Sequence, residues 1–590
     1  MVAMRNVTAL LPLLALVTAA PAGLQAQAQS ARNRRAPTGP VDLPRHYVGG
    51  PTSAAISSQD LMTRLYIYAD DSMMGRDAFS DDDARATAYI EREVRRLGLE
   101  PAGEDGYFQY PLIRRSTDSA ASTLSVGGTP FALWRDFAPR DQGTGARAFD
   151  GASVVYGGSI GDTAHFIRPE DAAGKVVLVT LARDSAGHPD PENVNRGQLT
   201  ARFVGAAAIA VAQLDYVPAG YVMDAYGQPQ PGVRGNVPST PVPSYFYVTG
   251  AVARAMLGRE VESVAPGTAG VAVHGAIAWS ETRAPGRNVI GILRGSDPAL
   301  RNEYVAIGAH NDHIGFMQSR GRFVDADSIR IYNRRLRPQG VEEPSRAPTA
   351  EEAALLRAAV DSAHQRNGGP RADTIFNGAD DDGSGSMGVL EIAEYFANAR
   401  VHPKRSLLFV WHVGEEYGML GSGYFTAHPT VPRDSIVAQL NVDMIGRGDA
   451  DDITGIRKDS ALITGGPGYV QLIGSRRLST ELGDLVERTN TRRRLGMSFD
   501  YSLDADGHPQ NIYCRSDHWS YAKWGIPIVF FTTGGHSDYH QPSDEPQYID
   551  YAHMERVVTL IADVAEDVAN LDHRVVVDHP RPDPTARCQQ

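Results

Sequence analysis

Four apolar, strand-like runs in this chain each lead towards a short polar motif. The runs occupy residues 304–309, 407–411, 436–440 and 526–531, and they lead towards His310-Asn311-Asp312, Gly414-Glu415-Glu416, Asn441-Val442-Asp443 and Tyr539-His540, respectively. Nearly continuous apolar runs of this length are typical of strands buried on both faces of a parallel sheet. Groups that follow such strands meet in the crevice beyond their carboxyl ends. We therefore expect an α/β fold with a mixed, largely parallel sheet flanked by helices.

Five side chains from these motifs and from an acidic turn form a candidate metal centre. They are two imidazoles and three carboxylates: His310, Asp380, Glu416, Asp443 and His540. A mixed nitrogen and oxygen set of this kind suits two adjacent divalent cations, most plausibly zinc, bridged by one carboxylate. Taken alone, each motif also has a structural explanation, because single histidines and surface acids are common. Their joint occurrence after four strands favours a two-metal hydrolase.

The acidic turn is the run Asp380-Asp381-Asp382, which precedes a helical pattern beginning near Met387. Three adjacent carboxylates repel one another unless cations or helix-terminal amides compensate their charge. One of them could bridge two cations. A surface turn or a calcium-binding loop is the alternative interpretation of this segment taken by itself.

The adjacent acids Glu415 and Glu416 follow the second of the four runs. Neighbouring side chains on an extended segment point in different directions, so one can bind a metal while the other faces a metal-bound water. The second carboxylate could then accept a proton from that water and return it to a leaving amine. Glu415 is the candidate general base and Glu416 the candidate ligand.

Composition limits the classes of function. A chain of 590 residues has room for two or three domains, and its net charge of −13 argues against non-specific binding to nucleic acid. Its two cysteines, Cys514 and Cys588, exclude a disulfide scaffold, and the sequence leaves open whether they pair. A cysteine nucleophile is a weak alternative, because no activating base stands near Cys514 in the sequence.

The first residues have the pattern of an export signal. Residues 7–19 are mostly apolar, and residues 24–28 offer small-residue processing sites. We expect a signal peptide over 1–28, a flexible lead-in over 29–55 and an exported, periplasmic or extracellular protein. No other segment is apolar for long enough to span a membrane stably.

The remaining chain is expected to form a catalytic domain that is interrupted by an insert. Its first part covers residues 56–134, a β-rich block covers 135–283, and its second part covers 284–575, followed by a tail over 576–590. A smaller, charged insertion at 317–372 separates two of the polar motifs. Such an insertion could be a lid or specificity element, or simply a solvated excursion.

The motif series HND, GADDDGSG, GEEYG, NVDM and SDYHQPSD resembles the zinc-dependent aminopeptidase family. This family includes bacterial leucyl aminopeptidases, glutamate carboxypeptidases and glutaminyl cyclases. The resemblance covers about 57–130 and 286–570. It implies that His310 and Asp443 complete one zinc site, that Glu416 and His540 complete the other, and that Asp380 bridges them.

The same resemblance suggests roles for three further residues. Glu415 matches the general base, and Asp312 matches the acid behind the first histidine ligand. Tyr513 matches a tyrosine that helps to stabilise the oxyanion. Some family members have a disulfide around that tyrosine, whereas this chain has only Cys514 there.

The β-rich block resembles a protease-associated domain through residues 174–179 and 205–208. Domains of this kind are non-catalytic, and they shape access to a site or bind partners.

The leading hypothesis is therefore an exported aminopeptidase with a peptide substrate, two zinc ions per chain, a metal-bound hydroxide and a glutamate general base. A carboxypeptidase of the glutamate carboxypeptidase type is the first alternative, and it would need a cationic group for the substrate carboxylate. A glutaminyl cyclase fits the two-metal arrangement less well. A non-enzymatic binding ectodomain on the same fold is opposed by the intact Glu415 and the complete set of candidate ligands.

Overall fold

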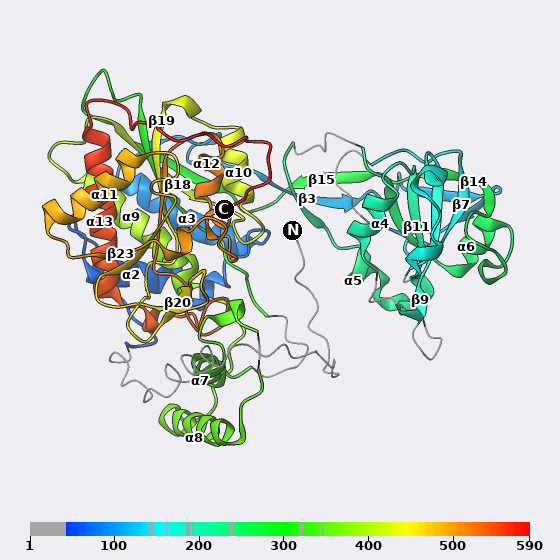
Figure 1. Cartoon of the computed structure of the whole chain (residues 1–590), viewed down its shortest axis with the longest axis horizontal. Helices are drawn as coiled ribbons and strands as arrows, with labels where there is room; N and C mark the ends of the chain where they lie inside the picture. The colour runs from blue at the N-terminus through cyan, green and yellow to red at the C-terminus, as the bar shows by residue number, and fades with distance from the viewer. Residues whose placement is uncertain are drawn as a thin grey trace. The chain divides into compact units, whose positions relative to one another are not determined.

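The computed structural model describes residues 43–140, 146–160, 162–183, 189–190, 194–235, 241–317, 324–344 and 346–590. The expected signal peptide and the first part of the lead-in lie outside these residues. The chain divides into two compact units (Figure 1). One contains the described residues up to Pro111 together with Ala284–Gln590, and the other is Leu112–Arg283.

The first unit is built on a nine-stranded mixed sheet. Eight strands follow the order β1-β16-β18-β17-β19-β24-β22-β23, and β2 also pairs with β16. The bounds are β1 Glu100–Pro101, β2 Phe108–Gln109, β16 Asn288–Leu293, β17 Tyr304–His310, β18 Ser406–His412, β19 Ile436–Val442, β22 Tyr469–Ile473, β23 Ser498–Asp500 and β24 Ile528–Thr532.

The four central strands β18, β17, β19 and β24 run parallel to one another, while β16 and β22 are antiparallel to their inner neighbours. These four strands contain most of the apolar runs recognised in the sequence. The predicted mixed α/β fold is confirmed.

Helices cover both faces of this sheet. Alternate strand residues point to opposite sides, and apolar side chains on each side pack against helices. On β17, Val305 and Ile307 pack into one apolar cluster, whereas Tyr304 and Ala306 pack into another. Helices on the first face contribute to the larger cluster: α2 Ser58–Tyr68, α3 Asp81–Arg96, α9 Gly385–Ala397, α11 Thr480–Arg493 and α13 Tyr551–Asn570. The second face is covered by α10 Leu420–Ala427 and α12 His518–Ala522.

A charged insertion of this unit contains two helices, α7 Ala326–Leu336 and α8 Ala350–Asn367 (Figure 1). Helix α8 begins with a capping box, in which the Thr349 side chain accepts from the Glu352 amide and the Glu352 side chain accepts from the Thr349 amide. A small hairpin of β20 Ile453–Ile456 and β21 Leu462–Thr464 lies elsewhere in the same unit.

The second unit is rich in β structure, as its sequence indicates. Its main sheet has the order β5-β4-β14-β7-β8-β11-β13-β6, and a smaller sheet has the order β12-β3-β15. It begins at Leu112, earlier than the change in sequence texture near residue 135, because β3 already pairs with β15. The bounds are β3 Leu112–Thr117, β4 Thr123–Val126, β5 Thr129–Phe131, β6 Phe137–Arg140, β7 Ala152–Ser159, β8 Val176–Thr180, β9 Ala182–Arg183, β10 Pro189–Asp190, α4 Arg196–Arg202, β11 Ala208–Ala212, α5 Val222–Tyr226, β12 Gln230–Val233, β13 Ser244–Val248, α6 Gly250–Leu257, β14 Ala269–Ala276 and β15 Trp279–Arg283.

The two cysteines form a disulfide between Cys514 and Cys588, with a Cα–Cα distance of 5.8 Å. The bond ties the C-terminal segment to the turn that precedes α12. Gln590 adds to this attachment, because its side chain accepts from the Tyr513 amide and donates to the Ala505 carbonyl. Within the described part of the chain, no helix has both the length and the apolar character required to cross a membrane.

Candidate metal centre

The candidate ligands gather at one end of the central parallel strands. His310 is the last residue of β17, and Asp443 directly follows β19. Glu416 lies four residues beyond the end of β18, and His540 lies eight residues beyond β24. The structure thus brings four of the five predicted ligands together in the expected crevice.

Asp381 lies at the centre of this group. Its Oδ1 is 3.1 Å from His310 Nε2, and its Oδ2 is 2.9 Å from His540 Nε2. Each histidine faces one further carboxylate: His310 Nε2 is 3.7 Å from Asp443 Oδ1, and His540 Nε2 is 3.0 Å from Glu416 Oε2. Two groups of three donor atoms therefore share one carboxylate, which offers one oxygen to each group.

These separations fit two cations. Ligand atoms that stand about 2.0–2.2 Å from a tetrahedral zinc ion lie about 3.3 Å from one another. The observed distances of 2.9–3.7 Å bracket this value. The residues present are therefore of the right type and spacing to hold a pair of divalent ions.

Asp380 lies outside this arrangement, although the resemblance to the aminopeptidase family implies a bridging position for it. Its Oδ1 accepts hydrogen bonds from the Gly446 amide and the Ser384 hydroxyl, and its Oδ2 lies 3.2 Å from His536 Nε2. The backbone of the acidic turn is irregular, with non-helical angles at Asp381 and Asp382. A regular sequence pattern cannot show which of three consecutive acids such a turn directs inwards.

Asp382 is also buried beside His310 and Asp443, and its proximity makes it a possible ligand. Its carboxylate, however, accepts hydrogen bonds from the backbone amides of His310, Gly385 and Met444. These bonds join the acidic turn to the ends of β17 and β19. The Asp382 carboxylate is thus occupied by backbone amides, whereas the two oxygens of Asp381 face the two histidines.

The orientation of His310 is fixed from behind. Its Nδ1 is 3.0 Å from the backbone carbonyl oxygen of Asp312, a contact in which Nδ1 donates and which leaves Nε2 free to face Asp381. A second ring nitrogen held in this way is common among histidine ligands of metals. The carbonyl oxygen of Asp312 makes this close contact, and its carboxylate oxygen Oδ1 lies 3.7 Å from the same nitrogen.

The carboxylate of Asp312 instead holds the segment that carries the two glutamates. Its Oδ1 accepts hydrogen bonds from the amides of Gly414 and Glu415, at 2.7 and 3.1 Å. Glu415 then lines a pocket beside the centre. Burial raises the pKa of the Glu415 carboxyl well above its ordinary value, as expected for an acid enclosed near other acids.

His313 was not selected from the sequence, yet it is fully buried at the same centre. Its Nδ1 is 2.7 Å from Glu416 Oε1 and 3.8 Å from Asp381 Oδ2. The signal that could have revealed it is its position three residues after His310, in the same polar motif. Its contact with Glu416 can hold one carboxylate oxygen while the other faces His540.

The charges of the centre favour cations. Although burial opposes protonation, the surrounding carboxylates raise the pKa of His310 and of His540 well above the ordinary value. Metal ions compete with protons for such nitrogens. The excess of carboxylates over imidazoles therefore favours the binding of cations at this site.

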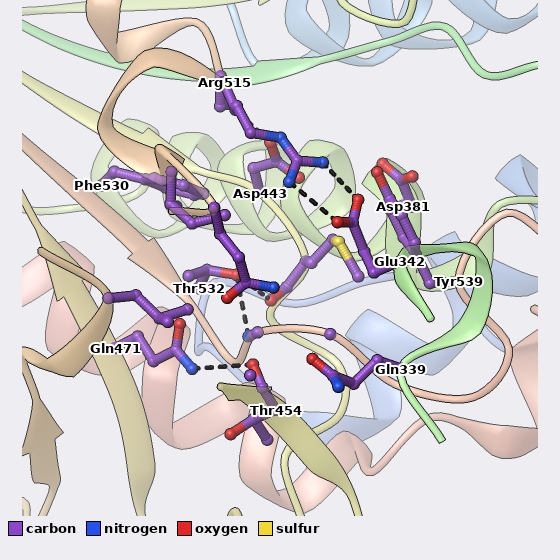
Figure 2. A pocket seen from close by; sticks show the side chains of 18 of the residues that line it. Gln339, Glu342, Asp381, Asp443, Thr454, Gln471, Arg515, Phe530, Thr532 and Tyr539 are labelled. Atoms are coloured by element: carbon purple, nitrogen blue, oxygen red, sulfur yellow. Dashed lines mark hydrogen bonds and ion pairs between the residues drawn. The ribbon is translucent and has the colours of Figure 1, made fainter. Parts of the chain in front are cut away.

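A pocket with a cavity volume of about 110 Å³ adjoins the centre, and Asp381, Glu415 and Asp443 form part of its wall. Figure 2 shows this pocket with Asp381 and Asp443 labelled. Apolar cavities of roughly 150 Å³ are large enough to hold benzene. The pocket can therefore take a side chain of moderate size. Its lining includes four apolar side chains, which are Met444, Leu503, Ile512 and Phe530.

Polar groups complete the pocket. Gln471 and Thr454 lie together on one side of it, and Arg515 lies on another (Figure 2). Two further residues, Gln339 and Glu342, come from the charged insertion. The insertion therefore forms part of the wall of the pocket.

Tyr513 occupies a different place. Its buried ring packs against His518 and Trp519, with the Arg477 guanidinium 4.7 Å from the ring centre. It contributes to a second cavity with Arg477 and residues of the C-terminal segment, and it is not among the residues that line the pocket beside the centre. The structure thus places the adjacent residue Ile512 and the nearby Arg515 in the pocket, and Tyr513 behind it.

Part of the sequence also matches the model of a known protein family. Residues 341–565 match the family model described as Peptidase family M28. The matched region contains Asp381, Glu415, Glu416, Asp443 and His540, whereas the His310 motif lies before it.

Two of the curated relatives illustrate the similarity to part of this chain. Leupeptin-inactivating enzyme 1 of Streptomyces exfoliatus is 29% identical over 184 residues, which cover 30% of this chain and 34% of the relative. A probable leucine aminopeptidase of Arthroderma benhamiae is 29% identical over 200 residues, which cover 32% of this chain and 48% of the relative. The chain thus spans about a third to a half of the length of the curated relatives it matches.

Solved structures with a similar outline include an aminopeptidase from Aneurinibacillus sp. strain AM-1, with 16% identity and a TM-score of 0.41 over 89% of this chain and 98% of the other. They also include BSAP, a zinc aminopeptidase from Bacillus subtilis, with 14% identity and a TM-score of 0.42 over 88% of this chain and 96% of the other. The resemblance that the sequence motifs indicated is confirmed for residues 341–565, which match the model of Peptidase family M28.

Proposed function

We propose that this protein is an exported, two-zinc aminopeptidase that removes N-terminal residues from peptides. The observation that carries the proposal is the position of Asp381, whose two oxygens face two different histidines at 3.1 and 2.9 Å. A carboxylate in this position suits a pair of cations better than a single one. The peptidase family of the matched region and the zinc named for BSAP support the choice of zinc.

Each zinc ion would have three protein ligands. His310, Asp381 and Asp443 would hold one ion, and Asp381, Glu416 and His540 would hold the other. Three protein ligands leave a position open for water or substrate, as in other catalytic zinc sites. When bound, zinc would lower the pKa of a water molecule and polarise the carbonyl group of the substrate.

The protein's own residues would then move the proton. Glu415 lies in the pocket wall beside the proposed ligands, with its backbone held by Asp312, so its carboxylate could accept a proton and return it. It would take the proton from the attacking water and deliver it to the leaving amine. Asp312 would act as a positioning residue, because it contacts the backbone of Glu415 rather than the substrate.

The pocket would bind the N-terminal residue of the peptide. Its apolar lining suits an uncharged side chain, and the nearby carboxylates of Asp381, Glu415 and Asp443 suit a free α-ammonium group. An N-acetyl group would remove the positive charge and add volume to a cavity of about 110 Å³. Peptides with a blocked N-terminus should therefore be poor substrates.

The test combines metal analysis with a matched pair of substrates. Elemental analysis of dialysed protein should give two zinc ions per chain, and Leu-Gly-Gly should be hydrolysed far faster than N-acetyl-Leu-Gly-Gly. At most one tightly bound ion would contradict the pair of sites. Efficient cleavage of the blocked peptide from its C-terminus would replace the aminopeptidase by a carboxypeptidase.

One observation favours this second function. A carboxypeptidase needs a cationic group for the substrate carboxylate, and the structure places Arg515 in the pocket. The guanidinium is already paired with Glu342, at 2.6 Å, which weakens the case. We therefore retain the aminopeptidase as the leading function.

Two further proposals concern the rest of the chain. We propose that residues 1–28 direct export, which N-terminal sequencing of the mature protein from a periplasmic or extracellular fraction would test. We also propose that the unit Leu112–Arg283 is a non-catalytic protease-associated domain, based on its motifs. Alanine substitutions at its exposed charged residues should then leave the hydrolysis of Leu-Gly-Gly unchanged.

A further inference from the structure

Arg515 is the only arginine or lysine among the described residues that line the pocket beside the metal centre. Its two terminal nitrogens lie 2.6 and 3.2 Å from the two carboxylate oxygens of Glu342, so the pair is bidentate (Figure 2). Paired bonds of this geometry are among the stronger and more directional ion pairs in proteins. The positive charge that could attract an anionic substrate is therefore already neutralised.

The neutralising carboxylate comes from the charged insertion, outside the sheet that forms the metal centre. Glu342 ends a short helical turn, Gly340–Glu342, in the connection between α7 and α8. Gly340 has a φ angle of +60°, and a Cβ atom there would lie 2.7 Å from the Tyr539 carbonyl oxygen. This close approach requires glycine, and it holds the insertion against the segment that carries His540.

A second attachment lies on α7. The Arg330 guanidinium lies 3.6 Å from the centre of the Tyr548 ring, and its Nε is 3.5 Å from Asp538 Oδ2. The insertion is thus held at two places, on α7 and at the turn that presents Glu342. Such attachments keep Glu342 at a defined position beside Arg515.

We propose that Glu342 is a specificity-determining residue that excludes substrates with a carboxylate group in this pocket. The proposal rests on the function proposed above and narrows its substrates to peptides that bring an uncharged group to Arg515. With Glu342 present, an entering carboxylate meets a neutralised guanidinium as well as Glu415 and Asp443. Without Glu342, the same carboxylate could take its place in a bidentate pair with Arg515.

The carboxylate could reach Arg515 from two sources. One is the acidic side chain of an N-terminal glutamate, and the other is the C-terminal carboxylate of a dipeptide. Both present the same chemical group, so both belong to the proposal. Two substrate pairs distinguish the two sources. The first pair is the p-nitroanilide of glutamate and that of glutamine. The second pair is the dipeptide Leu-Gly, with a free C-terminal carboxylate, and the C-terminal amide of the same dipeptide.

The decisive variant is Glu342→Gln, which keeps the shape of the side chain and removes its charge. For each substrate pair, the measured quantity is the kcat/KM of the acidic member divided by the kcat/KM of the neutral member. We expect Glu342→Gln to raise this ratio at least tenfold in one of the two pairs. The partly exposed pair, with Arg515 38% and Glu342 29% exposed, supports a change of this size rather than a much larger one. Glu342→Ala is the second variant, should glutamine disturb the turn.

Glu351→Gln is the matched control. Glu351 is an exposed residue in the first turn of α8, so its substitution changes the charge of the same insertion without reaching the pocket. Both substrate ratios should stay within twofold of the wild type. The double variant Glu342→Gln/Arg515→Met should lose the gain of the single variant, because the proposal assigns that gain to the released guanidinium.

A gain for the glutamate pair identifies the side-chain source, and a gain for the dipeptide pair identifies the terminal source. Ratios that stay within twofold in both pairs for Glu342→Gln and for Glu342→Ala overturn the proposal while leaving the aminopeptidase intact. A gain that persists in the double variant overturns it as well.

Failure of the proposed function has a different signature. The zinc-loaded wild type would then cleave none of the four substrates. In that case, calorimetric binding of L-glutamate and L-glutamine to the wild type and to Glu342→Gln decides the question. A rise of at least tenfold in the relative affinity for glutamate supports the role of Glu342, and an unchanged relative affinity overturns it.

Discussion

The adjacent residues Asp380 and Asp381 direct their carboxylates into different surroundings. Asp381 faces His310 and His540 with its two oxygens, at 3.1 and 2.9 Å. Asp380 faces the Gly446 amide, with a nitrogen–oxygen distance of 2.6 Å. One residue is therefore placed to join two cations, and its neighbour is placed to hold the backbone around them.

This difference predicts opposite effects on metal binding. Asp381→Ala should lose both zinc ions, because each proposed site contains one of its oxygens. Asp380→Asn should retain both, because an amide oxygen can still accept from the Gly446 amide and the Ser384 hydroxyl. Elemental analysis of the two dialysed variants checks this prediction. Loss of zinc in Asp380→Asn with retention in Asp381→Ala would restore Asp380 as the bridging residue.

Glu415→Gln should retain the metals and lose turnover. The proposed ligands do not include Glu415, whereas glutamine cannot accept the proton of the attacking water. General-base assistance contributes at least ~10²-fold to rates, and kcat for Leu-Gly-Gly should fall by about that factor. Glu416→Gln is the contrasting variant, which should weaken zinc binding because Glu416 lies 3.0 Å from His540 Nε2. Turnover of Glu415→Gln within threefold of the wild type would refute the assignment.

Much of the centre could be predicted from the sequence because it follows the parallel strands. His310 and Asp443 stand at the ends of buried strands, and parallel topology alone brings such residues to one edge. The choice between Asp380 and Asp381 depends on an irregular turn, whose angles no periodic pattern specifies. The position of Tyr513 was hard to predict for the same reason, because a short helical turn directs its side chain towards Arg477.

The contribution of the insertion could not be predicted for a different reason. Glu342 is far in sequence from Arg515, and their contact depends on the close approach of Gly340 to Tyr539. The pairing of Cys514 with Cys588 likewise depends on the path of the C-terminal segment. Contacts of this kind are determined by tertiary packing, which leaves no local signal in the sequence.

Gly340 provides a test of the insertion as part of the pocket. Gly340→Ala should shift the turn, because its Cβ would stand 2.7 Å from the Tyr539 carbonyl oxygen, and Glu342 would move with it. A displacement of about 1 Å at a site can cost up to ~10²-fold, so kcat/KM for Leu-Gly-Gly should fall roughly tenfold or more.

Gly368→Ala is the control for backbone strain. Gly368 also has a left-handed φ, +75°, but no atom lies within 4 Å of the position its Cβ would take. Both variants carry the left-handed cost of about 1–2 kcal/mol, so both should unfold at a lower temperature. Only Gly340→Ala should lose activity. Equal losses of activity in the two variants would show that strain, rather than displacement of the turn, causes the effect.

His518 predicts how stability depends on pH. Burial lowers the pKa of its imidazole to about 3, and its Nε2 donates to the Tyr513 carbonyl at 2.7 Å. The unfolded chain binds this proton near pH 6.5, whereas the folded chain does not bind it until about pH 3. The free energy of unfolding should therefore fall as the pH drops through this window, by about 1.4 kcal/mol per pH unit for this residue.

Between pH 7 and pH 5, the free energy of unfolding of the zinc-free wild type should fall by about 2 kcal/mol more than that of His518→Gln, which has no titrating group at this position. Urea unfolding of both proteins at the two pH values measures the difference. Equal losses would mean that His518 takes up its proton in the folded protein.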